Sequence, residues 1–480
     1  MPLWIPQVDE DKGEPIYRQI VQALNDDIAA GRLAAGARLP PHRELADELL
    51  VARGTVAQAY REAESLGLVR SDVGRGTYVL GLDSEASSYA SLIEKPVIQG
   101  DLTTNHPLTN IDPDPADALR ELANRPDRKA LLRYQSNQGI PRHRTTGAAW
   151  ARRYGIVANH ERVLVCAGAQ HALFVALAHL TEPGSAVLVE EWSYPGLTAI
   201  AETLRLRLVP VGMDEHGLCP DSLLRVLRRD RARVLYLMPT LHNPLGIVMP
   251  EERRARLCEL IRQRELVVLE DAAHQLLEPN PPRPLSARVP ERGYFVASTS
   301  KILCPGLRVA YLICPEDQCE RVARQIWATQ WMVSPIGPEV VSLWIERGVA
   351  DRTLRAKRKE ARRRQKLARR VLADFTLLAN HNALHLWLTL PEGCSADQIA
   401  SRARQQNIGV TPSSAFWMRS TKTPARLRIA LGGIDDSAEL DEALERLVSL
   451  IRANSATRRT NQQENWATNT PIARLVRKKT

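Results

Sequence analysis

Residues 294–308 have the sequence Tyr-Phe-Val-Ala-Ser-Thr-Ser-Lys-Ile-Leu-Cys-Pro-Gly-Leu-Arg. The first four residues form an apolar run that is typical of a buried β-strand. Ser298 and Ser300 follow it, then Lys301 and, seven residues later, Arg308. Serine and arginine side chains bind anionic groups, and a lysine amine can form a covalent bond with a carbonyl compound. The stretch therefore predicts a chemical site at the end of a buried strand.

Further apolar runs surround this stretch and decide the fold class. Each is apolar throughout and is separated from the next by an amphipathic helical pattern. The runs lie at 163–166, 186–189, 234–237, 266–269 and 294–297. Such strands, alternating with helices, indicate an α/β domain whose mostly parallel sheet is covered on both faces. From about Asp351, a long basic helix is expected to lead into a second, smaller α/β unit.

A separate pattern occupies residues 14–80. Pro15 can open a helix, and apolar residues then recur at helical spacing as far as Ile28. Two more helices and two short strands are expected at 42–50, 53–66, 68–70 and 77–80. A helix, a helix-turn-helix and then a hairpin is the order of a winged helix-turn-helix.

The domain boundaries follow from these patterns. Residues 1–80 are expected to form the winged helix-turn-helix domain, and the serine-containing stretch 81–98 to be a linker. The larger α/β region covers 99–453. Residues 454–480 are rich in Asn, Thr, Gln and Arg, and we expect them to be a disordered basic tail.

Composition narrows the possible environments. No apolar run approaches the roughly 20 residues that a membrane span needs. The seven cysteines are scattered and include no CxxC pair. This pattern argues against a disulfide or zinc framework and for a reducing compartment. We therefore expect a cytoplasmic protein with no metal site and no membrane attachment.

The net charge of +10 is a poor guide to binding partners because it is unevenly distributed. Residues 352–370 hold eleven Lys or Arg and one Glu, whereas residues 1–80 hold nine basic and twelve acidic side chains. We expect the basic run to be the solvated face of a charged helix, with a second nucleic-acid site as the alternative.

The N-terminal pattern resembles the winged helix of GntR-type regulators. The matching segments lie at 15–17, 31–33, 36–40, 43–46, 51–56 and 76–79. The resemblance implies binding to double-stranded DNA. Arg53 and Thr55 begin the expected recognition helix, from which side chains reach base edges in the major groove. Arg38 and Arg43 suit backbone phosphates, and Gly76 would let the wing approach the minor groove.

The α/β region resembles fold-type I aminotransferases, and the whole chain resembles the MocR family, in which such a domain follows a GntR-type module. Separated motifs fall in the family's order, at 168–170, 191–196, 242–246, 267–271 and 298–308. The resemblance implies the cofactor pyridoxal 5'-phosphate (PLP), bound to Lys301 as a Schiff base.

The resemblance also implies which residues hold the cofactor's phosphate. Backbone N–H groups at Ala169 and Gln170 would open a helix whose N-terminus suits an anion. Ser298 and Ser300 would add hydroxyl groups, and Arg308 would supply the positive charge.

Around the ring, the resemblance assigns stacking to Tyr194, hydrogen bonding at the 3-oxygen to Asn243, and pairing with the pyridine nitrogen to Asp271. The family usually has a tyrosine two residues after the aspartate, where this chain has Ala273. Whether His274 compensates for it stays open. Losing one hydrogen bond would weaken the cofactor's hold without abolishing it.

Two more residues are assigned by the resemblance. Arg428 matches the arginine that grips the carboxylate of an amino-acid-like ligand, a task suited to its bidentate fork. Tyr134 matches a segment that reaches the neighbour's phosphate in fold-type I dimers, which implies a homodimer. Trp192 stands where a proline is common and could narrow the substrate side.

The combination predicts a PLP-dependent transcriptional regulator that senses a small amino compound or a B6 vitamer. The alternative is a catalytically active aminotransferase that carries a DNA-binding module, and Ala273 argues mildly against it. The effector, the operator and the direction of regulation do not follow from the sequence.

Overall fold

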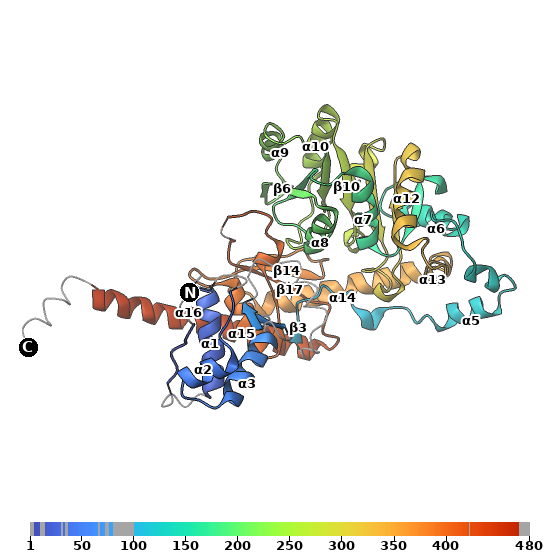
Figure 1. Cartoon of the computed structure of the whole chain (residues 1–480). Helices are drawn as coiled ribbons and strands as arrows, with labels where there is room; N and C mark the ends of the chain where they lie inside the picture. Colours follow the sequence, from blue (N-terminus) through green and yellow to red (C-terminus); the bar gives the residue numbers. More distant parts are fainter. Residues whose placement is uncertain are drawn as a thin grey trace, which may run out of the picture. The chain divides into compact units, whose positions relative to one another are not determined.

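The computed structural model describes residues 4–9, 15–29, 32–33, 37–65, 68–72, 76–79, 100–421 and 423–469 (Figure 1). It divides into two compact units, Met1–Ser88 and Tyr89–Thr480. The expected linker 81–98 lies outside the described residues. Among the residues that are described, no helix is long and apolar enough to cross a membrane.

The N-terminal unit has the predicted winged helix-turn-helix order. Its elements are α1 (Ile16–Ala29), α2 (His42–Glu48), α3 (Arg53–Ser65), β1 (Val69–Asp72) and β2 (Gly76–Val79). The two strands pair antiparallel. A small core joins the three helices, where Ile20, Leu24, Leu45, Val56 and Ala59 are fully buried. This packing fixes α3 against α1 and α2.

A seven-stranded sheet forms the centre of the second unit, and each of the five predicted apolar runs is one of its strands. The strands are β4 (Val163–Cys166), β5 (Ala186–Glu190), β6 (Arg207–Val211), β9 (Val234–Leu237), β10 (Val267–Asp271), β11 (Gly293–Ser298) and β12 (Ala310–Ile313). Their order is β4-β12-β11-β10-β9-β5-β6. Only β12 runs antiparallel to its neighbours, so the sheet is mostly parallel, as predicted.

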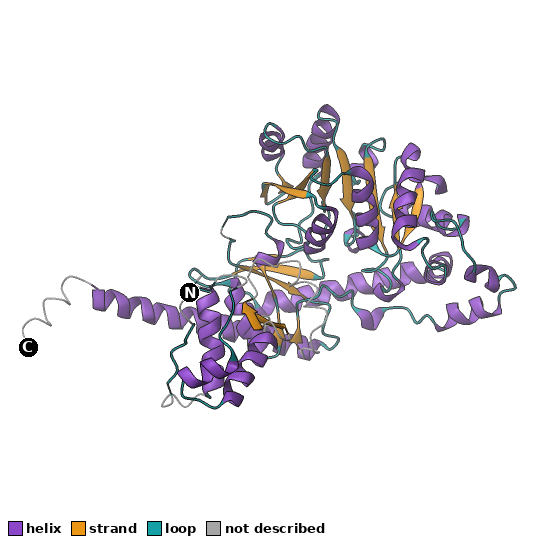
Figure 2. Cartoon of the chain, in the orientation of Figure 1, coloured by secondary structure: helices purple, strands orange, loops and turns teal. Residues whose placement is uncertain are grey.

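Helices cover both faces of this sheet (Figure 2). They are α6 (Pro141–Arg152), α7 (Ala169–Leu180), α8 (Pro195–Leu204), α9 (Pro220–Leu227), α10 (Glu251–Gln263), α11 (Leu285–Arg288) and α12 (Cys319–Gln330). Neighbouring strand residues belong to different cores, since Leu164 packs in one cluster and Val165 in another. Because both faces are buried, the central residues of the strands are apolar, and charged residues such as Glu190 and Asp271 occur at the strand ends.

The basic run forms the helix α14 (Val349–Val371), which follows α13 (Ile336–Glu346) and leads into the smaller α/β unit. That unit has a four-stranded sheet in the order β13-β14-β17-β16. Its strands and helices are β13 (Leu377–Leu378), β14 (His385–Thr389), β16 (Thr411–Pro412), β17 (Arg426–Ala430), α15 (Ala396–Gln405) and α16 (Ser437–Asn469). The short elements α5 (Ala116–Asn124), β3 (Gly100–Asp101), β7 (Met213–Asp214), β8 (Gly217–Leu218) and β15 (Ile408–Gly409) complete the described α-helices and β-strands.

The C-terminal segment differs from the sequence-based expectation. We expected disorder from residue 454, but α16 continues to Asn469. Arg, Gln, Glu and Ala in this segment are good helix formers, and they can extend a helix that the core has already nucleated. Residues 470–480 lie outside the described part of the chain.

Candidate functional site

A cavity of about 140 Å³ lies where the parallel strands of the large sheet end. Asp271 is the last residue of β10 and Ser298 the last residue of β11, so their side chains share one edge of the sheet. The lining consists of Asn105, Ala169, Gln170, Tyr194, Met238, Asn243, Asp271, Ala273, His274, Ser298, Ser300, Lys301 and Arg308. Of the ten residues predicted to bind the cofactor, only Tyr134 is absent from this lining.

One end of the cavity is suited to an anion. The helix α7 begins there, and Gly168 precedes it with a φ of +86°. A Cβ at Gly168 would lie 2.5 Å from a guanidinium nitrogen of Arg308, so only glycine leaves room for that side chain. The backbone N–H of Ser300 donates to the hydroxyl of Ser298 at 3.2 Å. A helix N-terminus, an arginine and two hydroxyl groups thus meet at one point.

Asp271 is the buried carboxylate of the cavity. One of its oxygens accepts the backbone N–H of Ala273 at 3.0 Å, and the other accepts the hydroxyl of Tyr236 at 3.1 Å. Tyr236 pairs with Leu269 in the neighbouring strand, so it lies on the same face of the sheet as Asp271. Burial raises the pKa of Asp271 to about 6. A cationic partner in the cavity would lower it again.

Lys301 is the amine of the cavity, and the residue is partly buried. Its Nζ donates to the backbone carbonyl of Asn105. Burial, together with the positive charges of Arg428 and Lys357, lowers the pKa of Lys301 to about 8, and Asp271 opposes the shift. An amine with a depressed pKa has a larger neutral fraction near neutral pH, which makes it a better nucleophile.

Arg428 lies beside the cavity and not in its lining. It is fully buried in β17, and its guanidinium donates to the side-chain oxygen of Asn243 at 3.1 Å and to the hydroxyl of Thr411 at 3.2 Å. It also donates to the backbone carbonyl of Thr103. Asn243 therefore connects the predicted carboxylate-binding arginine to the predicted ring-binding cavity.

His274 lines the cavity next to Ala273, the position where the family's tyrosine was expected. It is 3% exposed, and its Nδ1 has no hydrogen-bond partner among the described residues. Burial lowers the pKa of His274 well below its usual value, with Lys301 and His385 contributing. The ring is therefore neutral at physiological pH and can offer one donor and one acceptor.

Tyr134 lies away from the cavity of its own chain. Its side chain is 82% exposed and contacts the ring of Trp331 at 5.4 Å between centroids. Trp331 in turn contacts Trp327, and Leu132 and Ile336 are also exposed. Large exposed apolar side chains that touch one another are typical of protein interfaces.

The residues predicted to bind DNA lie on the surface of the N-terminal unit. Arg53 is the first residue of α3 and is exposed. Thr55, two residues later, is half-buried. Arg43 is exposed on α2, 3.9 Å from Asp47. The backbone of Arg38 forms an isolated antiparallel β-bridge with Tyr78 of β2.

Gly76 is required where β2 begins. Its φ is +113°, and a Cβ there would lie 2.8 Å from Nε of Arg38. The glycine therefore lets the Arg38 side chain lie against the hairpin. Residues 73–75, the tip of the predicted wing, lie outside the described residues.

Several residues of the cavity were not predicted from the sequence. Asn105 precedes Lys301 by 196 positions and reaches it only through the fold, so no local pattern could reveal it. Met238 is one apolar residue among many. Tyr236 lies outside the lining and donates to Asp271, and it gave a usable signal, because a hydroxyl in an otherwise apolar buried strand needs a partner.

Comparison with known proteins agrees with these two units. The model of aminotransferase class I and II matches residues 97–447, and that of the bacterial regulatory proteins of the gntR family matches 16–79. The chain is 28% identical over 455 residues to the HTH-type transcriptional regulator YdeF of Bacillus subtilis, covering 93% of this chain and 96% of the relative. It is 29% identical over 441 residues to the vitamin B6 salvage pathway transcriptional repressor PtsJ of Salmonella typhimurium, covering 89% and 98%.

Among solved structures, the α-aminoadipate aminotransferase LysN of Thermus thermophilus is similar, with a TM-score of 0.69 and 25% identity over 78% of this chain and 98% of that chain. That structure contains a phosphopyridoxyl-leucine ligand. The family thus implies PLP as the cofactor of this chain.

The residues present fit that cofactor. An anion cradle for the phosphate, a buried carboxylate for the ring nitrogen and an amine for the aldehyde share one cavity. The cavity also contains polar atoms without partners among the described residues, on Gln170 and His274, which a polar ligand could satisfy. The chain belongs to the aminotransferase class I and II family, and with its N-terminal gntR-family domain it has the domain organisation of MocR-type transcriptional regulators.

Proposed function

We propose that this chain is a transcriptional regulator that binds operator DNA through its N-terminal unit and PLP through Lys301. A small amino compound or a B6 vitamer would act as its effector. One observation carries the proposal: a cavity lined by Lys301, Asp271 and Arg308 occurs in a chain whose first unit is a winged helix with exposed arginines.

The cavity's own residues divide the work of holding the cofactor. The N-terminus of α7 and Arg308 would hold the phosphate, while Tyr194 and Asn243 would contact the ring. The Asp271 carboxylate would keep a proton on the ring nitrogen. When bound, PLP supplies an electron-withdrawing ring to an amino compound. We propose that His274 takes the place of the family's missing tyrosine, because its neutral ring lies in the lining.

The class of effector is narrowed by charge. Arg428 and Asn243 form a cationic, hydrogen-bonding pair beside the cavity, which favours an amino compound that carries a carboxylate. The name of the relative PtsJ, a repressor of vitamin B6 salvage, favours a vitamer instead. Both classes enter the same cavity, so titration with each can separate them.

We propose that the protein acts as a homodimer in the cytoplasm, where its DNA would be. The exposed cluster of Tyr134, Trp327 and Trp331 supports dimerisation, because burying these rings would remove a large apolar surface from water. A dimer would present two DNA-binding units and would therefore require paired half-sites.

An absorption titration tests this proposal. Purified protein with PLP should show a visible band of lysine-bound cofactor, and one class of compound, amino acids or vitamers, should shift it. A protein that gains no such band with excess PLP would contradict the proposal.

The second candidate function is a working aminotransferase. The joint presence of Asp271, Lys301 and Arg428 favours it, since these groups suffice to bind an amino acid next to the cofactor. Steady conversion of an amino acid and a keto acid over many turnovers would support the enzyme. A spectral shift without turnover would support the regulator.

A further inference from the structure

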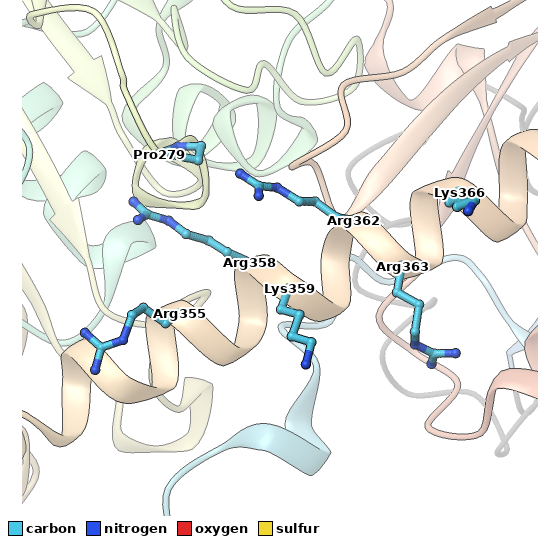
Figure 3. Close-up of a pocket in the computed structure, with 7 residues that line it drawn as sticks. All are labelled: Pro279, Arg355, Arg358, Lys359, Arg362, Arg363 and Lys366. Carbon is cyan, nitrogen blue, oxygen red and sulfur yellow. The ribbon is translucent and has the colours of Figure 1, made fainter.

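A basic groove of about 540 Å³ runs along α14, on the aminotransferase-like unit. Its lining consists of Pro279, Arg355, Arg358, Lys359, Arg362, Arg363 and Lys366 (Figure 3). Figure 3 shows Arg358 and Arg362 extending toward the loop that carries Pro279, and Lys359 and Arg363 extending away from it. No acidic residue lines this groove. The lining therefore has six positive charges, of which one, that of Arg363, is paired with Glu360 at 2.7 Å outside the lining.

The spacing of these side chains makes the charge a continuous stripe. Counted from Arg355, they lie at positions i, i+3, i+4, i+7, i+8 and i+11, which share one face of a helix. From Arg355 to Lys366 the stripe is about 16 Å long at the rise of an α-helix. A single phosphate or carboxylate would occupy only part of it.

The buried cations of the same helix each have a carboxylate partner, whereas in the groove only Arg363 has one among the described residues. Lys357 donates to the carboxylate of Asp112, and Arg364 pairs with Glu360 at 2.7 Å. Arg364 also donates to backbone carbonyls, including that of Asp435 at 2.8 Å. These cations stabilise the fold.

Three of the groove's side chains have no such role. Arg355, Lys359 and Lys366 have no hydrogen bond or ion pair with any described residue. Arg358 and Arg362 are partly held, since Arg358 donates to the carbonyl of Leu276 at 2.8 Å and Arg362 to the side chain of Asn382 at 2.8 Å. The stripe thus combines positioned arginines with unpaired charges.

The stripe also opposes the stability of its own helix. Like charges four residues apart repel each other, and α14 has four such pairs in the groove: 355/359, 358/362, 359/363 and 362/366. Elsewhere the chain places an acidic residue near an exposed arginine, as in Arg120 with Asp117. A helix that only had to be solvated would gain from the same arrangement.

We propose that the basic groove binds the phosphate backbone of double-stranded DNA, as a second contact in addition to that of the N-terminal unit. This inference rests on the proposed regulatory function, because DNA held by the N-terminal unit raises the local concentration of duplex near α14. Duplex DNA carries a negative charge about every 1.7 Å of its axis, which matches a long stripe, and arginine forks bind phosphate bidentately.

A membrane surface fits the groove less well. An interfacial helix inserts an apolar face opposite its basic one. The apolar face of α14 is already buried in the protein, where Leu354, Ala361 and Ala368 pack in its cores. The sequence alone favours a solvated face, because a run of charges on a helix is usually one. It does not distinguish the buried, paired cations Lys357 and Arg364 from their exposed neighbours.

The test uses the full-length protein with PLP and a duplex of scrambled sequence, about 40 base pairs long so that it exceeds paired half-sites. The variant Arg355→Gln, Lys359→Gln and Lys366→Gln removes three charges that make no hydrogen bond or ion pair with the described residues. The matched control Arg152→Gln, Arg228→Gln and Arg324→Gln removes three exposed charges on α6, next to α9 and on α12. A second comparison, Arg38→Ala with Arg53→Ala, weakens the N-terminal unit alone.

Fluorescence anisotropy over a salt series gives the result. The groove variant should lower the slope of log affinity against log salt by about three, at roughly 0.9 per phosphate contact. Between about 50 and 200 mM salt, the factor by which DNA affinity falls should then be roughly 40 times smaller for the variant than for wild-type protein. The control should keep the wild-type slope. The groove variant should melt no lower than wild type, because repulsion on α14 is relieved.

Several results would overturn the inference. They are an unchanged slope in the groove variant, an equal change in the control, and a lower melting temperature that reveals a structural role. Loss of binding to phosphatidylserine–phosphatidylcholine vesicles with an unchanged DNA slope would assign the groove to membranes instead. If the Arg38 and Arg53 variant binds DNA with wild-type affinity while the groove variant has a lowered slope, the result would contradict DNA binding by the N-terminal unit. It would still support DNA binding by the groove.

Discussion

At the scale of single residues, burial shifts the pKa values of two ionisable groups of the cavity toward each other. The pKa of Asp271 is raised to about 6 and that of Lys301 is lowered to about 8. Each shift disfavours the charged form, and each is relieved when a ligand of suitable charge arrives. The site is thus unfavourable for its own charges until a cofactor with an anionic phosphate, a basic ring nitrogen and an aldehyde fills it.

The first prediction follows from Lys301. Only its neutral amine can attack an aldehyde, so capture of PLP should accelerate as pH rises toward about 8 and then level off. An ordinary lysine would continue to accelerate toward about 10.4. Borohydride trapping at a series of pH values, followed by mass mapping, measures this at Lys301. A labelling rate that still rises above pH 10, or an adduct on another lysine, would contradict the site.

The second prediction concerns Asp271 and its partner Tyr236. Asp271→Ala removes a charge-assisted contact to the cofactor and should weaken PLP binding by more than about 1.5–3 kcal/mol. Tyr236→Phe removes one hydrogen bond to that carboxylate but leaves its charge in place, so it should weaken PLP binding less than Asp271→Ala does. Ala273→Tyr should change the affinity less than Asp271→Ala does. Fluorescence titration of PLP ranks the three variants, and wild-type affinity in Asp271→Ala would remove this carboxylate from the pocket.

At the scale of elements, α3 exposes Arg53 at its start while its apolar side is fixed against α1. Arg53→Ala should cost about 1–3 kcal/mol of operator affinity and relax preference at one base position. Arg38→Ala should weaken binding to operator DNA and to scrambled DNA alike. It should also lower the slope of log affinity against log salt by about one. Mobility shifts at two salt concentrations separate the two effects. Unchanged operator binding by the Arg53 variant would place base recognition elsewhere.

The elements also explain how far the sequence leads. Strands β4, β9, β10 and β11 were predictable because burial on both faces gives each of them a continuous apolar run. Residues that sit at strand ends, such as Asp271 and Lys301, could be placed with them. Asn105 could not, because it reaches the cavity from a loop that only tertiary packing brings close. The extension of α16 was missed because composition alone does not reveal helix growth from a packed segment.

At the scale of the whole molecule, the exposed rings near Tyr134 predict a dimer. Trp331→Glu places a charge among Tyr134 and Trp327 and should dissociate the dimer, because burying an unpaired charge is costly. Val157→Glu is the control, an exposed apolar residue outside this cluster. Sedimentation velocity reports the oligomeric state. If Trp331→Glu remains as fully dimeric as the wild-type protein, the cluster is not the interface.

The two units make one regulator only if occupancy of the cavity changes DNA binding. Coupling of this kind is usually worth about 5- to 150-fold in affinity. The decisive measurement is operator affinity of wild-type protein and of Lys301→Ala during a titration with PLP, with cavity occupancy followed by absorbance. Operator affinity should change several-fold as PLP fills the wild-type cavity and stay constant in Lys301→Ala. A wild-type cavity that fills with PLP, alone and with amino compounds, while operator affinity stays constant would contradict a regulator that senses through Lys301.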